Sequence, residues 1–145
     1  MNDVVEALLR NHDLCVLCTC GAGGPLASLM SYCVEDDLAM LYVATRADSR
    51  KYKNVEHNPK VSVLIDNRDT VGDAAQRCAL TLAGRAEAVA DLDRRAVLGA
   101  HLLARHPQLE GIVQASDGVI LAIRIDSYLL VRGPDKALFI PRAPL

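Results

Sequence analysis

Aromatic side chains are scarce in this sequence, which has no tryptophan and one phenylalanine among its 145 residues. A platform that stacks nucleic-acid bases needs several exposed aromatic rings, so the composition argues against one. An excess of positive charge is missing as well, because the formal net charge is −2. Such a chain has no overall attraction for nucleic acid or for an anionic membrane surface. We therefore expect neither as a partner, and any anion site must be local.

Long apolar runs are also missing. No segment approaches the roughly 20 consecutive apolar residues of a membrane-spanning helix, and the N-terminus lacks the basic start and apolar stretch of a signal peptide. We therefore expect a cytoplasmic protein whose five cysteines are thiols. Because 51% of the residues are hydrophobic, the chain can build one solid core, and we expect a single domain over residues 1–145.

Apolar patterns and turn signals along the chain predict a mainly β protein with flanking helices. The expected strands cover residues 14–20, 26–34, 38–44, 60–66, 77–90, 119–131 and 137–140. The expected helices cover residues 3–11, 49–58 and 92–105, with N-caps at Asn2 or Asp3, at Asp48 and at Asp91. Gly84 interrupts the fifth strand and predicts a bulge or a close approach of another segment. Six or seven antiparallel strands fit best in a closed or nearly closed β-barrel, because closure removes exposed edges.

The second helix begins with a hydroxyl and two cations, Ser49, Arg50 and Lys51. A helix N-terminus is the positive end of the helix dipole, so cations are normally placed at the other end. An anion bound there would offset both the dipole and the side chains. Two further cations, Arg46 and Lys53, favour a phosphate over the alternative, a solvated basic turn in which Ser49 is only a cap. A single phosphate group is expected, since no G-x-x-x-x-G-K motif is present.

This segment is part of a longer pattern. The pattern consists of a leading helix, strand 14–20, a Gly-Gly-Pro turn that ends at Pro25, strand 26–34, the Tyr42–Thr45 strand end, Ser49-Arg50-Lys51, and a helix that closes at Asn58-Pro59 before Val61–Asp66. With these features the chain resembles the pyridoxamine 5′-phosphate oxidase-like family of FMN-binding split barrels. The resemblance is specific over the first half of the chain, and the second half matches in the order of its elements.

The resemblance implies an antiparallel split β-barrel that binds FMN as a homodimer. The FMN phosphate would be held by Ser49, Arg50 and Lys51. The residues beside the isoalloxazine or the ribityl chain would be Val43, Ala44 and Thr45, partly through their backbone groups. Those that face the flavin ring would be Ser28, Leu29, Met30 and Ser31. The resemblance also implies that strand 77–86 of the partner subunit completes the site.

Two departures separate the chain from the true oxidase. Its last residues lack the Arg-Leu-x-Pro ending that helps that enzyme hold pyridoxal phosphate, and strand 26–34 carries no arginine. Instead of vitamin B6 oxidation we expect an FMN-dependent oxidoreductase that acts on a small molecule, with NAD(P)H as a candidate electron donor. No catalytic side chain is assigned, because the flavin carries the redox chemistry. The alternatives are a non-catalytic flavin- or haem-binding module and a deazaflavin-dependent reductase.

Three cysteines near the N-terminus raise a metal site as an alternative. Cys18 and Cys20 share one face of a strand and Cys15 lies on the other face, so the three cannot converge on one ion. We therefore expect buried thiols and no metal. Surface positions are expected for three histidines, although a haem ligand among them stays an alternative: His57, His101 and His106.

Overall fold

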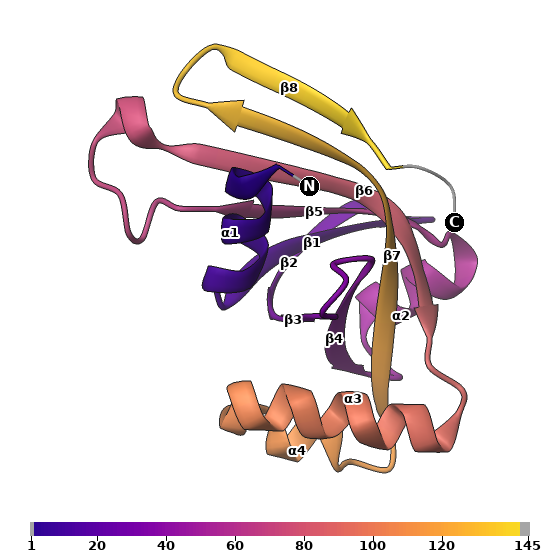
Figure 1. Cartoon of the computed structure of the whole chain (residues 1–145). Coiled ribbons are helices and arrows are strands. Elements are labelled where there is room, and N and C mark those ends of the chain that lie inside the picture. Colours follow the sequence, from indigo (N-terminus) through magenta and orange to yellow (C-terminus); the bar gives the residue numbers. More distant parts are fainter. Residues whose placement is uncertain (1, 143–145) are drawn as a thin grey trace.

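Eight antiparallel strands form one curled sheet in the computed structural model, which describes residues 2–142 (Figure 1). The strands are β1 (Leu14–Gly21), β2 (Gly24–Ser31), β3 (Cys33–Val34), β4 (Met40–Arg46), β5 (Lys60–Asp66), β6 (Cys78–Ala88), β7 (Gly118–Arg132) and β8 (Lys136–Pro141). The helices are α1 (Asp3–Asn11), α2 (Arg50–His57), α3 (Leu92–Arg105) and α4 (Glu110–Val113), with short 3-10 turns at Ala74–Gln76 and Pro107–Leu109. The predicted fold class, a mainly β split barrel with flanking helices, is confirmed.

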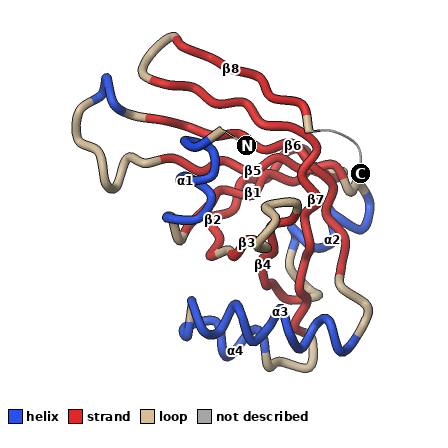
Figure 2. Tube along the Cα trace, in the orientation of Figure 1, coloured by secondary structure: helices blue, strands red, loops and turns tan. Residues whose placement is uncertain are grey.

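The sheet is curled but remains split along one side (Figure 2). Its strands follow the order β2-β1-β5-β6-β7-β4-β3, and β8 pairs with β7 outside this path. β2 forms one edge. At the other edge β3 pairs with β4 only at Leu41 and Tyr42, so the rest of β4 has no strand beside it on that side within residues 2–142. Curling brings parts of β2 and β4 close together, and their uncovered edges border the split.

Alternate residues of the strands point into the barrel and build its core. Four neighbouring strands each contribute a side chain that is at most 1% exposed: Leu17, Val63, Leu82 and Ile123. Helix α2 closes one end of this core with Val55. Its Asn54 Nδ2 donates a hydrogen bond to Thr19 Oγ1 on β1 at 3.1 Å. This contact satisfies two buried polar groups and fixes α2 against the end of β1, close to the β1–β2 turn.

Helix α3 covers the outer face of β4. Its Leu98 and Leu102 pack against Tyr42 and Ala44 of that strand and against Ile120 of β7. β4 is therefore buried on both faces, by the barrel core on one side and by α3 on the other. Within residues 2–142, no helix has the length and apolar character that crossing a membrane requires.

Several local predictions are confirmed. Asn2 caps α1 and Asp91 caps α3, since each side chain accepts hydrogen bonds from backbone N–H groups of the first turn. The register of β6 against β7 shifts between Ala83 and Gly84, as the bulge prediction required. Gly84 is needed there, because a Cβ atom would collide with the backbone carbonyl of Arg124.

The single strand expected over residues 26–34 is in fact two strands. β2 pairs with β1, whereas Cys33 in β3 pairs with Tyr42 in β4. Between the two strands Tyr32 is fully buried, and its hydroxyl donates a hydrogen bond to the Leu9 carbonyl of α1 at 2.8 Å. This contact lies at the point where the chain passes from one edge of the sheet to the other. The contact joins segments that are distant in sequence, so no local sequence pattern predicts the break between β2 and β3.

Candidate functional site

The outer edge of β2 exposes backbone hydrogen-bonding groups at the split. Tyr32 N, just after β2, donates to the Asp13 carbonyl at 3.3 Å and so faces the side of β1. Backbone groups alternate in direction along a strand, so those of Leu29 and Ser31 face away from β1. No strand pairs with β2 on that side within residues 2–142. Leu29 is also 68% exposed, so a bound molecule can reach this edge.

The four predicted ring-facing residues of β2 do not share one face of the sheet. Ser28 and Met30 lie opposite buried residues of β1, and Met30 packs against the barrel core. Leu29 and Ser31 lie on the outer face, where the exposed Leu29 side chain points away from the core. One flat ligand therefore cannot touch all four side chains, although it can reach the backbone of the β2 edge.

The part of β4 that β3 does not cover is a second place where backbone groups face the split. The carbonyls of Met40 and Arg46 accept hydrogen bonds from the adjoining turns, each at 3.0 Å, on the side away from β7. By the same alternation the N–H and C=O of Ala44 face that side. Neither group has a hydrogen-bond partner there among residues 2–142, although Ala44 is only 4% exposed. The side chains of Val43 and Ala44 are buried in the barrel and under α3, so only their backbone could meet a ligand.

The start of α2 lies directly after β4 and carries two joined hydroxyls. Ser49 is the N-cap, and its Oγ accepts a hydrogen bond from Tyr52 N at 3.3 Å. Thr45 Oγ1, at the end of β4, donates to the same Ser49 oxygen at 2.9 Å. The prediction of Asp48 as the cap was wrong by one residue, because aspartate and serine are both good caps and only backbone geometry decides between them.

Two cations of the predicted cluster have no acidic partner among residues 2–142, whereas a third forms an ion pair. Within residues 2–142 neither Arg50 nor Lys51 forms an ion pair. The Arg50 guanidinium lies over the β1–β2 turn, in the space that a side chain at Gly23 would fill. Arg46 instead pairs with Asp117 at 2.9 Å, so this cation has an acidic partner, unlike the other two.

The cysteines of β1 divide between its two faces, as predicted. Cys15 is buried in the core, while Cys18 and Cys20 lie on the outer face. Burial, with a smaller contribution from Cys18, raises the pKa of Cys15 to about 12, so this thiol is unreactive near neutral pH. The prediction of a buried thiol was wrong for Cys20, which is exposed because no element covers that end of the outer face in the described part of the chain.

The three histidines named in the sequence analysis differ in their exposure. His57 and His101 are exposed, as predicted. His106 was expected on the surface but is 3% exposed, and its Nε2 lies 2.7 Å from the Tyr32 carbonyl. The prediction failed because the turn after α3 folds back onto the β2–β3 junction. His101 Nδ1 lies 3.2 Å from the hydroxyl of Tyr42, whose pKa is raised mainly by burial.

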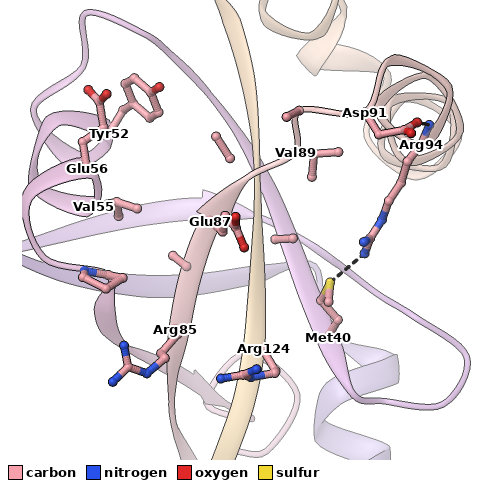
Figure 3. A pocket seen from close by; sticks show the side chains of 15 residues that line it. Met40, Tyr52, Val55, Glu56, Arg85, Glu87, Val89, Asp91, Arg94 and Arg124 are labelled. Carbon is pink, nitrogen blue, oxygen red and sulfur yellow. Dashed lines mark hydrogen bonds between the residues drawn. The ribbon is translucent and has the colours of Figure 1, made fainter.

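A groove that the sequence did not predict lies between α2 and α3 (Figure 3). Its volume is about 850 Å³, within the range of small-molecule sites. Part of its wall is apolar, with Val55 and Val89 as examples, and two arginines lie at one end, Arg85 and Arg124. They are adjacent because β6 pairs with β7. Only the strand register reveals this, which is why sequence reasoning missed the groove.

Comparison with known proteins gives the fold a family. The family model for pyridoxamine 5′-phosphate oxidase matches residues 1–132. No curated protein matches the chain. Among solved structures, a haem-binding protein from Mycobacterium smegmatis is 22% identical with a TM-score of 0.80; the match covers 94% of this chain and 56% of that one. An FAD-binding protein from Mesorhizobium loti is 19% identical with a TM-score of 0.72, over 90% and 94% of the two chains.

A third similar structure is the General Stress Protein 26 from Bacillus anthracis. It is 21% identical with a TM-score of 0.69, and the match covers 95% of each chain. At such identities the likeness of these structures concerns the fold alone, whereas the family model spans most of the sequence. The chain belongs to the pyridoxamine 5′-phosphate oxidase family.

Proposed function

We propose that this protein is an FMN-binding flavoprotein and an FMN-dependent oxidoreductase that acts on a small molecule. One observation carries the proposal. The start of α2 combines two hydroxyls, of Thr45 and Ser49, with two cations, Arg50 and Lys51, that have no acidic partner among residues 2–142. Family membership supports a flavin in general, and the single phosphate of FMN suits this small cluster.

The helix start fits a phosphate monoester on chemical grounds. Unpaired backbone N–H groups and the positive dipole end favour an anion. Arg50 and Lys51 would add charge-assisted hydrogen bonds, and Ser49 could donate its hydroxyl to the phosphate while accepting from Tyr52 N. Cations at this end of a helix are otherwise unfavourable, so a bound dianion removes a cost that the free protein carries.

The strand edges of β2 and β4 that border the split suit the isoalloxazine ring system of FMN. The pyrimidine end of an isoalloxazine alternates hydrogen-bond acceptors with a donor, and a strand edge offers the same groups in alternation. Leu29 and Ser31 present an accessible edge, and across the split Ala44 presents an N–H and a C=O that have no partner among residues 2–142. Backbone contacts need no particular side chain, which agrees with the mixed side-chain directions along residues 28–31.

When bound, FMN would supply two-electron redox chemistry, and the chain would supply binding, orientation and control of water. No side chain at the split needs to act as a nucleophile. Strand 26–34 lacks the arginine that the resemblance to the true oxidase would imply, which argues for another small-molecule substrate, with NAD(P)H as the candidate electron donor. A cytoplasmic location agrees with these reactants and stays a prediction.

We further propose that the protein works as a homodimer that associates through the apolar part of the outer face of the sheet. The strand registers align one residue from each of six strands in a row on this face: Leu29, Val16, Leu64, Thr81, Leu129 and Phe139. Leu29 and Phe139, at the two ends of this row, are 68% and 61% exposed. Exposed apolar side chains in one row mark an interaction surface, and a second copy is the occupant that the family resemblance implies.

The absorption spectrum of the freshly purified protein tests the cofactor. We expect a flavin spectrum, or one FMN bound per chain when apoprotein is titrated, and bleaching by NADPH or NADH. A folded protein that ignores FMN would contradict the proposal. A Soret band on haem titration, with no flavin binding, would favour a haem-binding module. A deazaflavin spectrum would favour a deazaflavin-dependent reductase.

Sedimentation velocity tests the dimer. The protein should sediment with twice the mass of the chain, and Leu29→Lys with Phe139→Lys should shift it to the monomer. Leu92 on α3 is 75% exposed but lies outside the row, so Leu92→Lys is the matched control and should leave the dimer intact. Equal dissociation of both variants would argue against this face.

A further inference from the structure

Three cations lie side by side across the outer face of the sheet. The registers place Lys60 of β5 opposite Arg85 of β6, and Arg85 opposite Arg124 of β7. Like charges directly opposite each other on neighbouring strands are destabilising. The row is unexpected in a chain whose net charge is −2. An anion bound to the row would remove this repulsion.

The acidic residues nearby do not neutralise the row. Within residues 2–142 the side chains of Lys60 and Arg85 make no hydrogen bond or ion pair. Arg124 approaches Asp126 at 3.8 Å, a long contact between two side chains that are 57% and 51% exposed. Such an exposed pair contributes little. The basic row therefore keeps its charge in the folded protein.

Two members of the row open onto the groove between α2 and α3. Figure 3 shows Arg85 and Arg124 at one end of the groove and Arg94 at the other. Arg94 is already engaged, since its Nη2 lies 3.2 Å from Glu35 Oε1. The free positive charge of the groove is therefore concentrated on Arg85 and Arg124, while the rest of the lining mixes apolar side chains with the carboxylates of Glu56, Glu87 and Asp91.

Another pair of facing cations shows what the groove adds. Arg132 of β7 lies opposite Lys136 of β8, and both are exposed. Neither residue lines the groove between α2 and α3. A like-charged pair alone is thus a feature of the surface, whereas Arg85 and Arg124 combine such a pair with a space of about 850 Å³.

We propose that Arg85 and Arg124 form an anion subsite of this groove, which binds a small organic molecule through a phosphate monoester group. Two adjacent guanidinium groups offer fork-shaped donors that match phosphate oxygens, and Lys60 adds a third charge at the rim. The body of the ligand lies along the apolar wall. Glu87, two residues further along β6 and also in the groove, limits the anionic part to the arginine end.

This subsite is separate from the proposed FMN phosphate site. Ser49, Arg50 and Lys51 do not line the groove. FMN carries one phosphate, which cannot occupy both clusters. That the groove binds a second molecule rests on the proposed FMN site, whereas the anion subsite itself does not depend on flavin binding.

Isothermal titration with phenyl phosphate at low salt tests the subsite, with phenol as the uncharged counterpart. We expect phenyl phosphate to bind and phenol to bind at least tenfold more weakly. Arg85→Gln with Arg124→Gln should weaken phenyl phosphate binding at least tenfold. Arg132→Gln with Lys136→Gln removes the same charge from β7 and β8 and should leave binding within twofold. Should the first double variant fail to fold, Arg85→Lys with Arg124→Lys keeps the charge, loses the fork, and should bind with intermediate affinity.

Four outcomes would overturn the proposal. They are no binding of phenyl phosphate by the wild type, equal binding of phenol, equal losses in the two glutamine double variants, and a dimer that dissociates in Arg85→Gln with Arg124→Gln while phenyl phosphate binding is unchanged. A parallel FMN titration separates this site from the cofactor site. FMN affinity should stay within twofold in both double variants, and a tenfold loss in Arg85→Gln with Arg124→Gln would instead make the groove the cofactor site.

Discussion

Two pairs of cations on this molecule are built in opposite ways. Arg50 and Lys51 are neighbours in sequence at the start of α2, where the helix itself attracts an anion. Arg85 and Arg124 come from two strands and meet only because β6 pairs with β7. The first pair follows from a short stretch of sequence, and the second from the register of the sheet.

The two pairs also differ in what surrounds them. Hydroxyls of Thr45 and Ser49 lie at the helix start, so that cluster can bind a phosphate with few additional contacts. The arginine pair opens onto a groove with an apolar wall, so it can select the body of a ligand as well as its charge. We infer that the helix start suits a cofactor phosphate and the groove suits an exchangeable molecule.

The largest effect on FMN affinity is expected when the two cations at the start of α2 are replaced. Arg50→Ala with Lys51→Ala deletes two charge-assisted contacts, each worth about 1.5–3 kcal/mol. FMN affinity should fall at least tenfold in a fluorescence titration, with the fold intact by circular dichroism. Arg132→Ala with Lys136→Ala removes equal charge elsewhere and should have little effect. Unchanged FMN affinity in the helix variant would remove the assigned phosphate site.

A smaller effect is expected from a substitution beside the arginine pair of β6 and β7, and it should weaken phenyl phosphate binding without changing FMN binding at α2. Gly84→Ala places a Cβ atom against the Arg124 carbonyl, and such overpacking costs about 1–3 kcal/mol. Urea unfolding should show this loss, and phenyl phosphate should bind more weakly while FMN affinity is kept. Gly72 has open space around it, so Gly72→Ala is the control and should change stability little. Equal stability of the two variants would mean that the bulge adapts at no cost.

Local chemistry explains which features could be predicted from the sequence. The caps Asn2 and Asp91 and the bulge at Gly84 each depend on a few adjacent residues, and all three predictions were right. The cap of α2 was missed by one position, because Asp48 and Ser49 have similar capping strength.

The features that were missed depend on contacts between distant segments. The break between β2 and β3 follows from Tyr32, whose hydroxyl reaches the Leu9 carbonyl. His106 is buried because it meets the Tyr32 carbonyl. Asp117 neutralises Arg46 across a long stretch of chain. Residue spacing contains none of this information, and the arginine pair of the groove is hidden for the same reason.

Ser49 has two roles that can be separated, and each is worth less than the cation pair. Ser49→Ala removes the cap of α2 and should lower the free energy of unfolding by about 1 kcal/mol. Ser49→Asp keeps a capping oxygen, so stability should be retained, but its carboxylate would repel a phosphate. FMN affinity should therefore fall in both variants, while the melting temperature falls only in Ser49→Ala. A Ser49→Asp variant with full FMN affinity would leave Ser49 as a cap only.

The smallest effect is expected at the ion pair that removes Arg46 from the helix cluster. Arg46 and Asp117 are 45% and 44% exposed, and pairs of this kind contribute about 0–1 kcal/mol. Asp117→Asn should therefore change the melting temperature little. It also frees the Arg46 charge near the helix start, so FMN affinity should rise, by less than about threefold because salt screens exposed charges. The rise should disappear at high salt and in Arg46→Gln with Asp117→Asn. A fall in affinity would show instead that the pair orients the loop before α2, since the Ala47 N–H bonds to the Asp117 carbonyl there.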